Sequence, residues 1–214
     1  MISNMTPSNI TPTPTTSSIN KDTVIRQLFA SVANSHIKEM FAIAKTTAEF
    51  SKDNRTKVGA VACFEKRIIG TGRNGFPAGF NDWVMYEKFS RQEKNSVTVH
   101  AEANLIAYCA RHGVPTKDAS IFITYPPCNE CCKLIITGGF KNVYYLADWE
   151  NMNPNSEWLY RYQLGVAMLK TSGISVFEVN PNYEVFSISY YDNEFALFDT
   201  ARKLQEYLSE PKES

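Results

Sequence analysis

The sequence has no excess of either charge, because 22 basic side chains balance 22 acidic ones in 214 residues. A protein that binds a polynucleotide backbone usually carries a basic excess, so this balance favours a small-molecule substrate. The sequence also lacks an apolar run of the roughly 18 residues that a membrane span needs. Its N-terminus shows no basic segment followed by an apolar one. We therefore expect a cytoplasmic protein with neither a membrane nor a nucleic acid as partner.

Cysteines are few and odd in number, which argues against a disulfide framework. There are five, and Cys128 and Cys131 form a C-x-x-C pair. In a chain without a secretory signal, such a pair is typical of reduced thiols that bind a metal. Cys63, Cys109 and Cys132 lie among apolar residues and are predicted to be small core side chains.

Apolar periodicity predicts alternating strands and helices over the middle of the chain. We expect helices at 36–50, 100–111, 129–137 and 157–172, and strands at 58–64, 68–71, 120–125, 141–147 and 174–179. This alternation implies an α/β sandwich with a mixed sheet. The Pro-interrupted, polar residues 1–20 are predicted to be a disordered tail, 21–180 a single domain, and 181–214 an extension with a strand near 183–190 and a helix near 193–208.

Three side chains from two segments have the spacing of a zinc site. His100 opens one predicted helix, and Cys128 and Cys131 lie in the first turn of the next. One imidazole and two thiolates fill three of the four tetrahedral positions of Zn²⁺, which is typical of a catalytic site. A helix N-terminus lowers the pKa of a cysteine, so it favours the thiolate that a metal needs. We expect the two helices to lie side by side on one face of the sheet.

Glu102, two residues after the histidine, is the expected proton carrier. The pattern H-x-E…P-C-x-x-C is the signature of the zinc deaminases, in which the glutamate is a general acid and base and not a ligand. In this chemistry, the zinc activates a water and the glutamate moves protons to the ring nitrogen and to the departing ammonia.

The alternative is a closed zinc site that only stabilises the fold. It needs a fourth protein ligand and gives Glu102 no role, so the catalytic interpretation is favoured. Cys132 is a poor fourth ligand, because its side chain points about 100° away from that of its neighbour on a helix. The other candidates that the sequence leaves open are His36, His112, Cys63 and Cys109, although both histidines are typical of surface or capping positions.

Four blocks of this sequence resemble the deoxycytidylate (dCMP) deaminases. They are 51–53 with 58–61, the glycine-rich 70–79, 99–104 and 127–131, and the similarity as a whole covers roughly residues 36–178 in the family's order. The resemblance implies a three-layer α/β/α cytidine-deaminase-like fold with a five-stranded mixed sheet. It also implies conversion of dCMP to dUMP and ammonia for thymidylate synthesis, one catalytic Zn²⁺ per subunit, and a homo-oligomer, often a hexamer.

The resemblance also assigns substrate contacts to this chain. Asn74 is expected to bind the deoxyribose, and the backbone of Ala101 the pyrimidine. Trp149 is a candidate to stack over the base. The candidates for the phosphate are Ser51, Lys52 and Arg55, although their loop could equally be only a solvated one.

The chain departs from the family's pattern in the glycine-rich block. Arg73 stands where the family has a tyrosine, and residues 75–99 contain neither Cys nor His. The second, structural zinc of some members should therefore be absent. Many members are activated by dCTP and inhibited by dTTP near this block, with Mg²⁺ accompanying the nucleotide, and Arg73 leaves that regulation open.

Two other functions are compatible with the motifs. A deaminase acting on tRNA or single-stranded DNA would need a basic groove and a pocket for a flipped base, and the neutral net charge argues against it. A non-catalytic deaminase-fold module that binds nucleotides would have no use for Glu102 and all three ligands.

Overall fold

The computed structural model describes residues 21–80, 88–147, 157–183, 185–187 and 202 of the protein. Its contacts divide the chain into two units, Met1–Ala33 and Asn34–Ser214. In the first unit, the described residues are the beginning of helix α1 (Lys21–Glu49). The predicted tail 1–20, the predicted helix 193–208 and Trp149 lie outside the described residues.

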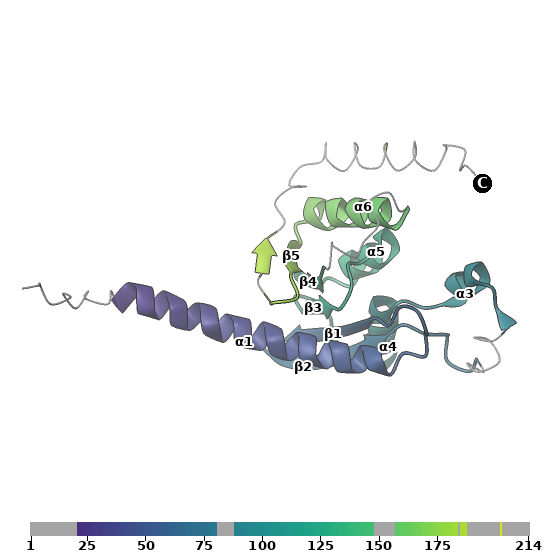
Figure 1. The fold of residues 1–214 in the computed structure, drawn as a ribbon, viewed down its shortest axis with the longest axis horizontal. Coiled ribbons are helices and arrows are strands. Elements are labelled where there is room, and N and C mark those ends of the chain that lie inside the picture. Colours follow the sequence, from purple (N-terminus) through teal and green to yellow (C-terminus); the bar gives the residue numbers. More distant parts are fainter. Residues whose placement is uncertain (1–20, 81–87, 148–156, 184, 188–201, 203–214) are drawn as a thin grey trace, which may run out of the picture. The chain divides into compact units, whose positions relative to one another are not determined.

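The second unit is organised around a mixed β-sheet (Figure 1). The strands described are β1 (Gly59–Phe64), β2 (Arg67–Arg73), β3 (Ser120–Ile123), β4 (Asn142–Leu146), β5 (Ser175–Val179) and β6 (Val185–Ser187). The helices that follow α1 are α3 (Arg91–Val97), α4 (Ala101–His112), α5 (Asn129–Thr137) and α6 (Glu157–Thr171). Among the described helices, none is both long and apolar enough to cross a membrane.

The strand order is β2-β1-β3-β4-β5-β6. β1 is antiparallel to β2 and β3, whereas β3, β4 and β5 run parallel. Parallel neighbours need a crossover connection, and α5 and α6 provide the two crossovers. The five expected strands are all present, and β6 lies within the strand predicted near 183–190, paired antiparallel with β5.

Helices cover both faces of the sheet, which confirms the three-layer prediction. On one face, Met40, Phe41 and Ala44 of α1 pack with Val61 of β1 and Phe122 of β3. On the other face, α4, α5 and α6 bury a larger apolar cluster against β1, β3, β4 and β5. Apolar burial from both sides explains why the central strands read as nearly continuous hydrophobic runs.

Two glycines allow helices to approach the strands closely. A Cβ at Gly59 of β1 would collide with the carbonyl oxygen of Ala44 in α1, and one at Gly72 of β2 would collide with that of Ala101 in α4. Glycines allow the backbone to approach a neighbour closely, and at Gly72 of the glycine-rich block the approaching element is α4, the helix that begins the candidate site.

The apolar pattern of 100–111 predicts that Tyr108 and Ala110 lie on the buried side of their helix. This prediction is wrong, because Tyr108 is 51% exposed and Ala110 is exposed as well. The buried residues of α4 are Ala101, Glu102, Leu105 and Cys109, so Tyr108 lies outside its buried face. The sequence also predicts that this helix ends at Gly113, and the left-handed conformation of Gly113 (φ 65°) confirms it.

Candidate active site

The three predicted ligands lie at the beginnings of two neighbouring helices. His100 is the N-cap of α4, and Cys128 is the N-cap of α5. Cys131 lies in the first turn of α5 and is buried. α5 follows β3 directly in the chain, so the cysteines lie just beyond the carboxyl end of that strand. The strand ends therefore position one motif, and the packing of α4 on β2 and β1 positions the other.

The ligand atoms are already arranged for a tetrahedral cation. The Nδ1 atom of His100 lies 3.5 Å from the Sγ of Cys128 and 3.4 Å from the Sγ of Cys131. With zinc–sulfur and zinc–nitrogen bonds of ordinary length, a tetrahedral ion holds its sulfur and nitrogen ligands about 3.5 Å apart. The donor set therefore fits Zn²⁺. Within the described part of the chain, no other group of three His, Cys, Asp or Glu side chains could hold a metal.

The charges of this cluster also fit a divalent cation. The pKa of the Cys128 thiol is lowered, chiefly by its hydrogen bond with Cys131 and also by His100. The same bond raises the pKa of Cys131, because two adjacent thiolates repel each other. The hydrogen bond with Cys128 raises the pKa of His100. A divalent cation would remove this conflict and let both cysteines bind as thiolates.

Glu102 lies in the first turn of α4 and is only 3% exposed. Burial raises its pKa to about 7, because a low-dielectric surrounding disfavours the carboxylate. His100 and Cys128 are close enough to act on that pKa by their charges. A carboxyl group with this pKa is half protonated at neutral pH, which suits a group that both accepts and donates protons.

The alternative of a closed, structural zinc site finds no support among the described residues. Cys132 is buried and points towards Gly165 of α6, where an added Cβ would lie 2.7 Å from its sulfur. Cys63 belongs to the cluster under α1 and lies 3.7 Å from His36. Cys109, in the third turn of α4, belongs to the apolar cluster on the other face. The remaining candidate, His112, is exposed at the far end of α4.

Two of the residues predicted to bind the substrate are joined beside the metal ligands. The Ser51 hydroxyl donates a hydrogen bond of 2.9 Å to the carbonyl oxygen of Asn74, and both residues are buried. The next residue, Gly75, pairs with Val99 as in an antiparallel bridge, and Val99 directly precedes His100. The glycine-rich block and the metal centre are therefore adjacent.

The other predicted substrate residues have different positions. Lys52 and Arg55 are exposed on the loop between α1 and β1. Ala101 is fully buried, and its carbonyl oxygen faces Gly72. Asp53 lies in the 51–53 block but is assigned no role there, and nothing in the sequence marks Lys94, because a lone charged residue in a polar stretch is usually solvated. Both residues are buried near this loop.

Three comparisons place these features among known proteins. The family model "Cytidine and deoxycytidylate deaminase zinc-binding region" matches residues 34–147. ComE operon protein 2 of Bacillus subtilis is 39% identical over 114 residues, which are 53% of this chain and 59% of that protein. Deoxycytidylate deaminase of Mus musculus is 31% identical over 154 residues, which are 70% of this chain and 82% of that protein.

A similar fold is found in a solved structure. The dCMP deaminase of cyanophage S-TIM5 in its apo form superposes with a TM-score of 0.53 at 25% sequence identity. The superposition covers 67% of this chain and 96% of the phage protein. The similarity thus extends over nearly the whole of a known deaminase.

Proposed function

This chain belongs to the family that shares the cytidine and deoxycytidylate deaminase zinc-binding region, and from that premise we propose that it hydrolyses dCMP to dUMP and ammonia. The product dUMP would feed thymidylate synthesis. The observation that carries the proposal is the preformed cluster of His100, Cys128 and Cys131 with the buried Glu102 beside it.

His100, Cys128 and Cys131 would hold one Zn²⁺ ion per subunit. When bound, the ion acts as a Lewis acid and lowers the pKa of a water molecule, so that a nucleophile is available at neutral pH. The residue His100 is exposed while Cys128 and Cys131 are both buried. A substrate would therefore approach from the histidine side.

Glu102 would carry the protons of the reaction. Its pKa of about 7 allows the carboxyl group to accept a proton and to return it within one catalytic cycle. We expect it to deliver one proton to the N3 atom of the cytosine ring and another to the departing amino group. Its burial keeps bulk water away from these transfers.

The substrate contacts are part of the proposal. Asn74 would bind the deoxyribose, the Ala101 backbone would contact the pyrimidine, and Trp149 would stack over it. Ser51, Lys52 and Arg55 would bind the phosphate. The bond between Ser51 and Asn74, and the position of Asn74 beside the residues before His100, support this arrangement.

The test is ammonia release from the zinc-loaded protein with dCMP, dCTP, cytidine and a cytosine-containing oligonucleotide supplied in parallel. Release from dCMP in preference to the other three is the expected result. Turnover of the oligonucleotide alone would overturn the proposal in favour of a polynucleotide deaminase, and no turnover of any substrate would favour a non-catalytic module.

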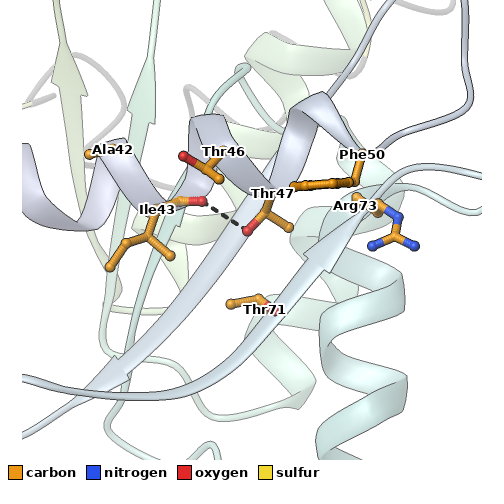
Figure 2. A pocket seen from close by; sticks show the side chains of 7 residues that line it. All are labelled: Ala42, Ile43, Thr46, Thr47, Phe50, Thr71 and Arg73. Carbon is orange, nitrogen blue, oxygen red and sulfur yellow. Dashed lines mark hydrogen bonds between the residues drawn. The ribbon is translucent and has the colours of Figure 1, made fainter.

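We also propose a cytoplasmic homo-oligomer whose activity responds to dCTP and dTTP with Mg²⁺. An open groove between α1 and β2 supports an effector site near the glycine-rich block (Figure 2). The guanidinium of Arg73 lines this groove together with Thr47 and Phe50, whose ring is 65% exposed. Nucleotide effects on wild-type turnover that disappear in Arg73→Ala would support the site, and equal effects in both proteins would contradict it.

A further inference from the structure

Lys94 of α3 is a buried cation that the proposed reaction does not use. The residue is only 7% exposed, although lysine is almost never buried without a partner. Its Nζ atom lies 3.8 Å from an Oδ1 oxygen of Asp53 and 3.3 Å from Oδ1 of Asn54. Lys94 therefore contacts the loop between α1 and β1, about 40 residues earlier in the chain.

Asp53, the partner of Lys94, determines the shape of that loop. Its Oδ1 accepts hydrogen bonds from the backbone N–H groups of Arg55 (2.8 Å) and Thr56 (3.1 Å). Its own N–H donates to the hydroxyl of Ser51. Asp53 is 7% exposed, so the lysine and the carboxylate form a buried ion pair at the base of a tight turn.

The same turn is bonded to the residues beside the metal centre. The side-chain amide of Asn74 donates to the carbonyl oxygen of Thr56 (2.7 Å) and accepts from the N–H of Val58 (2.9 Å). Together with the bond from Ser51 to the Asn74 carbonyl, this makes the loop and Asn74 one hydrogen-bonded unit. The unit contains Ser51 and Asn74 and carries Lys52 and Arg55 on its outer side.

We infer that Lys94 is a positioning residue for the phosphate subsite, and this inference rests on the proposed function. By neutralising Asp53, Lys94 leaves the carboxylate free to hold the turn through backbone groups. Without Lys94, the buried carboxylate would lack its cation and would attract Arg55 or Lys52 of the same loop. That movement would take a cation away from the substrate phosphate and would loosen the bonds to Asn74.

The experiment compares Lys94→Met with Lys94→Arg, which retains the charge, and with the wild-type protein. We expect Lys94→Met to raise KM for dCMP about tenfold with kcat changed less than about twofold. The Kd for dUMP, measured by calorimetry, should rise by a similar factor. Amide hydrogen exchange should become faster at Arg55 and Thr56, whose N–H groups bond to Asp53. In Lys94→Arg, KM, Kd and the exchange rates should return most of the way to their wild-type values.

Lys133→Met is the matched control. Lys133 also pairs with a carboxylate, that of Glu130 at 2.6 Å, but both side chains are more than half exposed. This variant should behave like the wild type.

A folded, zinc-loaded Lys94→Met protein with wild-type KM and Kd would overturn the inference. So would a fall in kcat at unchanged KM, which a purely structural disturbance would produce. If Lys94→Met does not fold, Lys94→Gln provides the same comparison, since it removes the charge but retains a side chain that can donate to Asp53 and Asn54. Wild-type protein that fails to deaminate dCMP would refute the proposed function instead, before any variant is compared.

Discussion

At the residue scale, the site combines a carboxyl group kept from water with three groups that could hold a cation. Glu102 is buried beside His100 because both lie at the start of α4, two residues apart. Burial raises the pKa of Glu102 to about 7. The residue can thus serve as acid and as base, whereas an exposed glutamate would be ionised throughout the neutral range.

Glu102→Gln should therefore reduce kcat by about a thousandfold or more while zinc remains bound, because glutamine fills the same space but cannot carry a proton. Ammonia release and zinc content measured on the same sample test this. Glu130→Gln, at an exposed position, is the control and should retain activity. If Glu102→Gln turned over substrate nearly as fast as the wild type, Glu102 would not be the proton carrier.

Removal of the metal should abolish turnover and make the Cys128 thiol reactive. Cys128 would be protected while it binds zinc, and a chelator should make it available to a thiol reagent, because its lowered pKa favours the thiolate. Cys131, Cys63 and Cys109 should stay unreactive in the folded protein, because their raised pKa keeps them protonated. Thiol counting with and without chelator, followed by zinc addition, checks this. More than one newly reactive thiol would indicate unfolding or a wrong ligand set.

At the element scale, α4 can position His100 and Glu102 only because it lies close to β2. Gly72 makes this possible, since an added Cβ would meet the Ala101 carbonyl and the backbone nitrogen of Leu105. The contact lies in the first turns of the helix, directly beside His100 and Glu102. A small change in strand β2 is therefore transmitted to the site.

Gly72→Ala should lower the free energy of unfolding by about 1–3 kcal/mol and weaken zinc binding, because the helix must move away from the strand. Gly75→Ala is the control for stability, since its added Cβ would meet nothing within 4 Å. Denaturant unfolding of the two variants side by side measures the difference. If Gly72→Ala and Gly75→Ala were equally stable, α4 would be able to move away from β2 without loss of stability.

Helix α3, which carries Lys94, begins with a capping box between Ser90 and Glu93. The hydrogen bonds from Ser90 lower the pKa of the Glu93 carboxyl. A carboxyl with a lowered folded-state pKa stabilises the helix at pH values above its usual pKa, and this contribution is lost as pH falls through the lowered value. An NMR titration should show Glu93 titrating below ordinary glutamates, and Ser90→Ala should reduce the shift, because only the backbone hydrogen bond to Glu93 remains. A Glu93 pKa equal to that of ordinary glutamates in the wild-type protein would contradict the capping box.

At the scale of the whole molecule, the layer on the site's side of the sheet contains a buried polar network. The hydroxyl of Tyr145 in β4 lies 2.6 Å from that of Tyr162 in α6 and donates to Glu178 in β5 at 3.3 Å. Tyr145 is fully buried, so its hydroxyl depends on these two partners. The network joins the parallel strands β4 and β5 to α6, the helix that crosses between them.

Tyr145→Phe should lower the free energy of unfolding by about 1–3 kcal/mol, because it leaves buried polar partners with fewer hydrogen bonds. Turnover per folded molecule should change little. Tyr108→Phe, at a position that is 51% exposed, should be neutral. Thermal or denaturant unfolding of both variants tests the expectation, and a neutral Tyr145→Phe would mean that the network adds no net stability.

The sequence by itself determined the chemistry of the site, because each motif is local. The two-residue separation of His100 and Glu102, and the three-residue separation of Cys128 and Cys131, correspond to single turns at the starts of helices. The alternation of apolar segments likewise predicted the strands and helices of an α/β sandwich with a mixed sheet, whereas the three layers were implied by the resemblance to the dCMP deaminases.

Only the tertiary structure decided which groups meet. His100 and Cys128 are separated by 28 residues, and their contact depends on how α4 and α5 pack on the sheet. The pairing of Lys94 with Asp53 spans a still longer separation and has no local pattern. Local periodicity encodes a face of an element, whereas a partner across the fold depends on packing that no single segment contains.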